Sequence, residues 1–376
     1  MISHSVLVRC AFAGAVVIAL ATIVTVNAAS LSLVRLPKPS GAWSIGRTTI
    51  TLGGGLTDIW YPVAKTATGK FAAYGTKGDR SIKQRVVGHI VFTSALLDAS
   101  PAQGRFPTIV FLPGWGGRRE SNTVQIQNLA SHGYVVAAID DRHRAADVDF
   151  SSAASLATSV VRAERKLDAQ VDDVLSLIDD LARLDHENDS IARHFDLSSL
   201  GIVGFSFGGA VAAEAARRDP RIRAAVNLDG YMYGGAYRTS VTRPFLYMST
   251  GDGEPADPST LNDQARRVQT FDREQGDRIV AGLHQSGGYF VAIDGSEHSS
   301  FTDSAALPSW LGGNRAKLAG IDGARLIGTC IVDFLDRTRR GTILRPPDFN
   351  CGSPIVHVLA AYAVPSDERD GAVVQK

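Results

Sequence analysis

LGIVGFSFGGAVAAEAAR, residues 200–217, is the stretch of the sequence that decides the fold. It begins with a short apolar strand at Leu200–Val203, passes through the glycine-rich turn GFSFGG and continues as an alanine-rich helix at Ala210–Arg217. The Gly-x-Ser-x-Gly pattern around Ser206 fits a strained turn that lifts a serine hydroxyl above a sheet, with small residues on either side. A structural serine in a glycine-rich turn is the alternative. The acid and histidine candidates that follow Ser206 in the chain favour a nucleophile.

Strands and helices alternate on both sides of this stretch. The expected strands are almost purely apolar, which suits a parallel sheet covered by helices on both faces. The sequence therefore predicts an α/β fold with a mostly parallel, doubly wound sheet and flanking helices. The expected strands lie at Thr108–Leu112, Tyr134–Ile139, Ala224–Leu228, Phe245–Ser249 and Tyr289–Ile293, and the expected helices at Val124–Ser131, Arg162–Leu184, Ala265–Gln275 and Leu326–Arg337.

The N-terminal part of this fold is predicted to open with antiparallel strands. Thr48–Leu52 and Thr57–Tyr61 are joined by the turn Gly53–Gly55, and Gly88–Phe92 is a further possible strand. We expect one catalytic domain over residues 40–345 and a C-terminal extension over 346–376, whose last residues, from Val364, form a loose tail.

Composition excludes several classes of protein. The 376 residues are 44% hydrophobic and 20% charged, with a formal net charge of +1, which is typical of a globular protein with a large core. The near-neutral balance lacks the basic surface that nucleic-acid binding needs. A small-molecule or lipid ester is the expected partner, peripheral contact with lipid surfaces stays open, and the oligomeric state is unknown.

The first 28 residues differ from the rest. An apolar run, Ala11–Val26, is short for a membrane span, and Val26 and Ala28 are small residues that fit a signal cleavage site after Ala28. We expect a signal peptide and a secreted or periplasmic protein. An uncleaved N-terminal anchor is the alternative.

The three cysteines bear on the compartment. Cys10 would be lost with the leader, which leaves Cys330 and Cys351. An even pair in an exported chain predicts a disulfide, and two unrelated thiols are the alternative. No metal-binding motif is present, and we expect neither a metal nor a cofactor.

A serine hydroxyl needs a base within hydrogen-bond reach. Of the nine histidines, His298 follows the last expected apolar strand, where this fold places its base. A solvated loop histidine is the alternative. Backbone N–H groups stabilise the oxyanion of the tetrahedral intermediate, and the positions of Trp115 and Phe207 fit the two donors. Trp115 could instead anchor its loop.

Six stretches resemble the platelet-activating factor acetylhydrolase family, the secreted or lipoprotein-associated serine type within the α/β-hydrolase superfamily. The resemblance implies an α/β-hydrolase fold and hydrolysis of short or oxidised acyl esters, phospholipid esters among them, without calcium. The chain differs from the family at Phe205, where histidine is usual, and at residues 142–144. We therefore transfer no role from the family to residues 142–144. The similar stretches are DIWYP (58–62), PGWG (113–116), SHGYVVAAI (131–139), RAE (162–164), SFGGA (206–210) and LDGYM (228–232).

Two aspartates compete for the place of the triad acid. The resemblance implies Asp229, whereas many α/β-hydrolases carry the acid in a loop such as the one at Asp252, after Phe245–Ser249. Both strand ends lie on one edge of a parallel sheet, and Asp229 is favoured.

The sequence predicts a serine carboxylic ester hydrolase that forms an acyl-Ser206 intermediate on short-chain esters. The short segment between Gly230 and Asp252 predicts a small lid or none, and therefore an open, shallow site. A cutinase-like lipase or polyester hydrolase is one alternative. A non-catalytic surface protein that keeps the hydrolase shell is another.

Overall fold

A computed structural model describes residues 34–75, 88, 90–143, 148–187, 189–251, 256–311, 313, 318, 321–341 and 349–363. The chain divides into two compact units, of which the smaller combines residues 1–35 with 73–92 and the larger combines 36–72 with 93–376. In the smaller unit, β1 (Val34–Arg35) pairs in parallel with Val91 and Phe92 at the start of β5 (Val91–Leu97). The expected leader, residues 1–28, and the expected loose tail from Val364 lie outside the described residues.

The larger unit is built on one mixed sheet. Its strand order is β5-β2-β3-β7-β6-β8-β9-β10-β11-β12, and the run from β7 to β11 is parallel throughout. This confirms the predicted mostly parallel, doubly wound sheet. Besides β5 and a short β4 (Phe71–Ala73), the strands are β2 (Ser44–Leu52), β3 (Gly55–Val63), β6 (Phe106–Leu112), β7 (Val135–Ile139), β8 (Phe195–Phe205), β9 (Ile222–Leu228), β10 (Phe245–Gly251), β11 (Gly288–Asp294) and β12 (Val356–Tyr362).

The antiparallel opening is also as predicted. β2 and β3 form a hairpin whose register runs from Ser44 opposite Val63 to Leu52 opposite Gly55. β3 then lies antiparallel to β7, which joins the hairpin to the parallel strands. The expected strand at Gly88–Phe92 begins later, at Val91, and extends to Leu97.

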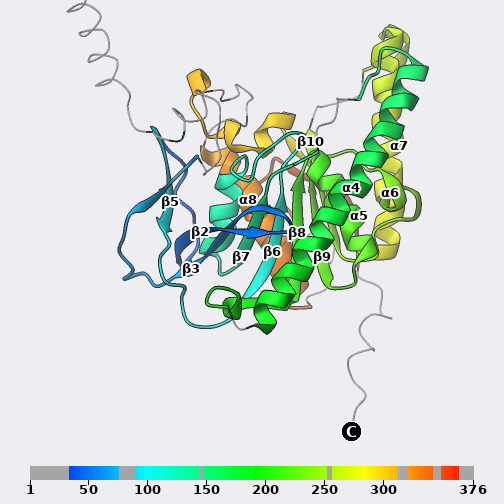
Figure 1. Ribbon diagram of the computed structural model, residues 1–376. Coiled ribbons are helices and arrows are strands. Elements are labelled where there is room, and N and C mark those ends of the chain that lie inside the picture. Colours follow the sequence, from blue (N-terminus) through cyan, green and yellow to red (C-terminus); the bar gives the residue numbers. More distant parts are fainter. Residues whose placement is uncertain are drawn as a thin grey trace, which may run out of the picture. The chain divides into compact units, whose positions relative to one another are not determined.

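Helices cover both faces of this sheet (Figure 1). Successive residues of a buried strand point to opposite faces, so Ile109 and Phe111 of β6 join one core cluster while Val110 and Leu112 join the other. α4 (Ala153–His186), α5 (Phe207–Arg218), α6 (Gly234–Thr239) and α7 (Asp263–Ser286) pack on one face, and α3 (Thr123–Ser131) and α8 (Ile321–Arg339) on the other. The short 3-10 helices are η1 (Ala192–His194), η2 (Pro258–Thr260), η3 (His298–Phe301), η4 (Asp303–Ala305) and η5 (Ser309–Leu311). None of the helices in the described ranges is long and apolar enough to span a membrane.

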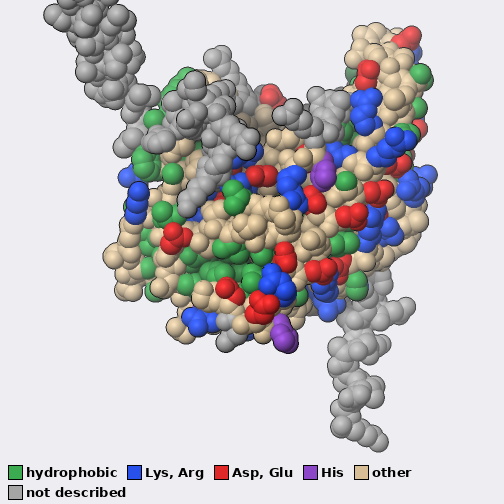
Figure 2. All heavy atoms as spheres, in the orientation of Figure 1, with side chains coloured by type: hydrophobic (Ala, Val, Ile, Leu, Met, Phe, Trp, Pro, Cys, Tyr) green, Lys and Arg blue, Asp and Glu red, His purple; other side chains and the backbone are tan. Residues whose placement is uncertain are grey.

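α4 begins at Ala153, before the expected start at Arg162, because Ser152 caps it. The Ser152 hydroxyl accepts a hydrogen bond from the Ser155 N–H at 3.0 Å, which satisfies one of the free donors of the first turn. The buried stripe of the helix faces α5 and the sheet, and its outer face is charged. Figure 2 shows acidic and basic side chains interspersed over this part of the surface, where Asp179 pairs with Arg221 at 2.7 Å.

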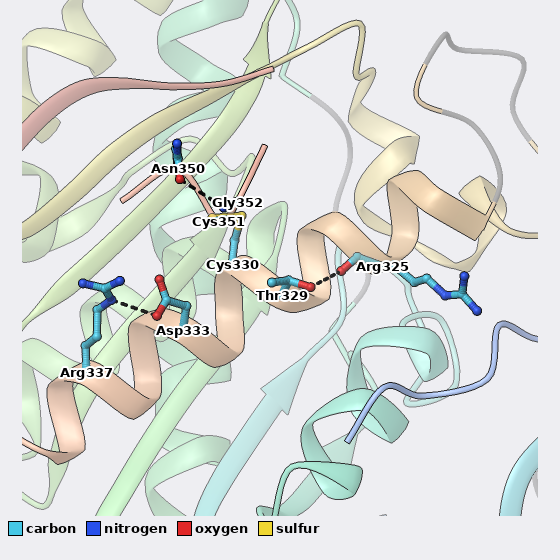
Figure 3. Close-up of a disulfide and its surroundings, with 8 residues drawn as sticks. All are labelled: Arg325, Thr329, Cys330, Asp333, Arg337, Asn350, Cys351 and Gly352. Atoms are coloured by element: carbon cyan, nitrogen blue, oxygen red, sulfur yellow. Dashed lines mark hydrogen bonds and ion pairs between the residues drawn. A yellow bond between two sulfur atoms is a disulfide. The ribbon is translucent and has the colours of Figure 1, made fainter. Parts of the chain in front are cut away.

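The C-terminal extension contributes β12, which the sequence analysis did not predict. β12 lies antiparallel to β11 at the edge of the sheet, and most of its side chains are at least partly exposed. Before β12, Cys351 forms the predicted disulfide with Cys330 of α8 (Figure 3). The bridge ties the extension to the helix layer.

We expect loss of this disulfide to lower the free energy of unfolding and to leave the predicted ester hydrolysis unchanged. The cysteines are 21 residues apart in sequence, and the chain-entropy model gives about 3 kcal/mol for a loop of that size. Cys351→Ser breaks the bridge and leaves the buried Cys330 in place, so urea unfolding of this variant measures the bridge itself. Free alkylation of both thiols in the native protein would contradict the pairing.

Candidate active site

Ser206 occupies the turn between β8 and α5, in a conformation that few non-glycine residues adopt. Its φ of 55° and ψ of −124° are held because its N–H donates to the Leu228 carbonyl of β9 at 2.8 Å. Backbone strain of this kind costs about 1 to 3 kcal/mol and persists only where the surrounding structure enforces it. The Ser206 side chain is half-buried at the carboxyl edge of the parallel strands.

The glycines on either side of Ser206 are required by close packing. A Cβ on Gly204 would lie 2.0 Å from the Gly208 oxygen, and a Cβ on Gly208 would lie 2.3 Å from the Pro113 oxygen. The turn is therefore pressed against the loop that follows β6, where Trp115 lies. The sequence pattern is confirmed in its structural context of strand, sharp turn and helix.

His298 lies at the start of η3, after β11, as predicted. Its Nε2 is 3.0 Å from the Ser206 Oγ, and its Nδ1 is 2.6 Å from Asp229 Oδ2. Glu297 and Ser300 form a reciprocal cap that fixes the start of this short helix. The Phe205 ring packs against the imidazole, with ring centroids 4.8 Å apart, so the residue that departs from the family pattern contacts the candidate base.

Asp229 extends β9 into the site and is held by the backbone around it. Its N–H donates to the Met248 carbonyl at 2.7 Å, and its Oδ1 accepts the Thr250 N–H at 3.1 Å. Both carboxylate oxygens are thus engaged, one by β10 and one by His298. Asp252, the competing acid, lies outside the described residues.

Trp115 and Phe207, the two candidate oxyanion donors, come from different elements and meet beside Ser206. Phe207 is the first residue of α5, so its N–H has no partner within the helix. In the loop of Trp115, the next two N–H groups donate elsewhere, that of Gly116 to Asp141 Oδ2 at 2.7 Å and that of Gly117 to the Gly114 carbonyl at 2.9 Å. The Trp115 and Phe207 rings meet edge to face with centroids 4.6 Å apart.

The site opens into a cavity of about 740 Å³. The prediction of an open, shallow site considered only the segment between β9 and β10, whereas residues of α7 and of the loop before α4 also line the cavity. A cavity of this size is within the usual range for small-molecule sites. Besides Ser206, Asp229 and His298, its lining includes Trp115, Phe150, Phe207, Tyr231, Tyr233, Tyr247, Asp272, Gln275, Ile279 and Phe290.

An aromatic cluster holds one wall of the cavity. Tyr231 and Phe271 meet at 4.9 Å between ring centroids, and Phe150 lies 5.6 Å from Phe271. Burial raises the pKa of Tyr231, and so does the hydrogen bond that its hydroxyl donates to Asp272 at 2.7 Å, so this tyrosine stays neutral. Arg267 of α7 donates to the Phe150 carbonyl at 2.9 Å. The wall is therefore fixed to α7.

Two charged residues behind Trp115 were not found from the sequence. Lys166 of α4 pairs with Asp141 at 2.7 Å, and their side chains are 5% and 0% exposed. The sequence did contain a signal for Lys166, because this charged residue lies on the apolar stripe of α4, between Ala163 and Gln170. Within the described part of the chain, no group of three His, Cys, Asp or Glu side chains could hold a metal ion.

The family model and the relatives that match this chain are all described as hydrolases. A family model described as PET hydrolase-like matches residues 62–261. Platelet-activating factor acetylhydrolase from Cavia porcellus is 24% identical over 229 residues, which cover 53% of this chain and 49% of that protein. The Gallus gallus protein of the same name is 24% identical over 302 residues, covering 68% and 67%. The chain thus spans about half of the length of the first of these relatives, and the predicted resemblance is confirmed.

A solved structure has the same architecture. The ferulic acid esterase from Streptomyces cinnamoneus superposes with a TM-score of 0.63 at 22% identity, over 87% of this chain and 100% of that one. At this identity the likeness concerns the fold alone.

Proposed function

The chain belongs to the PET hydrolase-like family, and we propose that it hydrolyses carboxylic esters through an acyl intermediate on Ser206. It has the α/β-hydrolase fold and is an ester hydrolase by family. The observation that carries the proposed mechanism is the hydrogen-bonded chain from Ser206 Oγ through His298 to Asp229, open to the cavity. The same chain of contacts argues against a non-catalytic surface protein.

In the first half-reaction, His298 Nε2 takes the Ser206 hydroxyl proton while Oγ attacks the ester carbonyl carbon. The oxyanion of the tetrahedral intermediate accepts hydrogen bonds from the Trp115 and Phe207 N–H groups. His298 then gives its proton to the alcohol oxygen as the carbon–oxygen bond breaks. Asp229 accepts the Nδ1–H throughout, which holds the tautomer and stabilises the imidazolium.

In the second half-reaction, Nε2 takes a proton from water, whose oxygen attacks the acyl carbonyl carbon. Collapse of the second tetrahedral intermediate breaks the bond to Oγ, and the proton returns from His298 to Ser206. The carboxylic acid leaves, and the free enzyme is restored. No redox step or cofactor enters this balance.

The substrates that we propose carry a short acyl group, and an alcohol portion that fills the rest of the cavity. Support comes from the relatives named acetylhydrolases. A cavity of about 740 Å³ is larger than an acetyl group needs, so we assign the remaining volume to the alcohol. We also propose that the protein is exported, because the Cys330–Cys351 disulfide suits an oxidising compartment and residues 1–28 fit the pattern of a signal peptide.

A panel of esters tests the acyl preference. We expect kcat/KM to fall from acetyl and butyryl to palmitoyl esters of one alcohol, because we assign most of the cavity to the alcohol portion. An acetylated phospholipid belongs in the same panel, and Ser206→Ala provides the background rate. Faster turnover of palmitoyl esters would contradict the proposal and favour the lipase alternative.

Polyester hydrolysis is a second candidate, favoured by the aromatic lining of the cavity. Seven aromatic rings face it: those of Trp115, Phe150, Phe207, Tyr231, Tyr233, Tyr247 and Phe290. Flat aromatic acyl groups stack well on such surfaces. A soluble terephthalate diester added to the panel distinguishes the two, because a preference for it over butyryl esters supports this candidate.

A further inference from the structure

Lys166 places a buried cation directly behind the candidate oxyanion hole. Its Nζ pairs with Asp141 Oδ2 at 2.7 Å, and the side chains of the two residues are 5% and 0% exposed. A buried ion pair contributes little net stability, because desolvation of both charges offsets their attraction. Stability alone therefore gives a weak account of this pair.

The same ammonium group contacts both residues whose N–H groups would bind the oxyanion. Lys166 Nζ lies 4.8 Å from the ring centroid of Trp115 and 5.0 Å from that of Phe207. A cation within about 6 Å of an aromatic face is attracted by the ring quadrupole, and more strongly when desolvated. One charge on α4 thus links the loop after β6 to the start of α5.

Asp141 extends this link to the backbone of the loop. The oxygen that pairs with Lys166 also accepts the N–H of Gly116, next to Trp115, and the Asp141 N–H donates to the Gly117 carbonyl at 3.0 Å. The loop is therefore held by its backbone through Asp141 and by the Trp115 ring through Lys166.

We propose that Lys166 is a positioning residue, which with Asp141 fixes the Trp115 and Phe207 N–H groups at the separation that the oxyanion requires. The inference rests on the proposed esterase function and adds a residue from outside the triad. Oxyanion donors act only within a narrow range of distance, so a small displacement of either N–H weakens transition-state binding more than substrate binding.

The test separates these two kinds of binding. In Lys166→Met the stem length is kept and the charge is removed; in Lys166→Met/Asp141→Asn both charges are removed, and the asparagine oxygen can still accept the Gly116 N–H. The double variant avoids an unpaired buried carboxylate and keeps the test valid if the single variant fails to fold. For a folded variant we expect kcat to fall by about 100-fold, with KM within threefold of the wild type.

A boronic acid that bonds to Ser206 provides the second readout, because its tetrahedral adduct places an oxygen in the oxyanion site. Its affinity should fall in parallel with kcat, and Lys166→Arg, which keeps the charge, should recover part of both. A merely structural pair would lower the unfolding midpoint and leave the ratio of boronate affinity to KM unchanged.

Arg47→Met is the matched control. Arg47 is also a buried cation, 4% exposed, paired with Asp58 at 2.6 Å and lying 4.8 Å from the Trp60 ring centroid, but it is on β2. We expect it to lose stability with kcat unchanged. If the double variant folds and keeps kcat and boronate affinity within twofold of the wild type, or loses no more than Arg47→Met, the inference is overturned while the esterase proposal stands. A wild-type protein that hydrolyses no ester in the panel overturns both.

Discussion

Replacing Ser206 by alanine is expected to lower kcat for ester hydrolysis by at least about 10⁴-fold while the protein stays folded. The substitution removes one half-buried oxygen that contacts His298 Nε2 and leaves the packing of the turn as it is. Alanine and serine have similar difficulty in adopting a φ of 55°, so backbone strain does not change. Steady-state rates on a butyryl ester, with urea unfolding in parallel, measure both expectations.

Ser198→Ala is the matched control for that experiment. Ser198 lies on the same strand, β8, where its exposed hydroxyl donates to Asp196 at 2.6 Å, and the variant loses the same atom. It should hydrolyse esters at the wild-type rate. If Ser206→Ala and Ser198→Ala were equally active, Ser206 would not be the nucleophile and the acyl-enzyme mechanism would be wrong.

The central strands could be predicted because burial on both faces leaves a continuous apolar run, as in Val135–Ile139. The ends of the helices were harder to predict. α7 extends beyond the expected Gln275 because Ile279 and Leu283 continue its buried stripe, while Gly276 and Gly282 interrupt the helical signal. β12 was missed although Val358–Tyr362 is an apolar run, because the polar, proline-rich residues before it predicted an irregular extension.

The structure brings Ser206 and His298 together as expected from the local pattern and from chain order. The walls of the cavity depend instead on tertiary contacts: Phe150, Tyr231 and Phe271 are far apart in sequence and meet only when α7 packs beside the sheet. The pairing of Lys166 with Asp141 likewise joins α4 to the end of β7. A charged residue on an apolar stripe could have drawn attention to Lys166, but no feature of the nearby sequence predicts that Asp141 is its partner.

Replacing each aspartate by asparagine distinguishes Asp229 from Asp252 as the triad acid, because of the two contacts that the Asp229 carboxylate makes. In the structure, Asp229 Oδ1 accepts the Thr250 N–H and Oδ2 contacts His298 Nδ1 at 2.6 Å. In Asp229→Asn, the amide oxygen keeps the Thr250 bond and the NH₂ group faces Nδ1. The imidazole must then accept at Nδ1 and carry its proton on Nε2, so it cannot take the proton of Ser206.

We therefore expect Asp229→Asn to lower kcat by about 10⁴-fold without unfolding the protein, since asparagine tolerates the positive φ of 56° at this position. Asp252→Asn, the same change at the competing residue, should cause only a modest loss. Measured kcat values for the two variants, with the unfolding midpoint of each, decide between them. If Asp252→Asn were the inactive variant and Asp229→Asn stayed near the wild-type rate, the acid would be Asp252. The contact between His298 and Asp229 would then have a structural role, and the resemblance of LDGYM to the acetylhydrolases would lose its functional meaning.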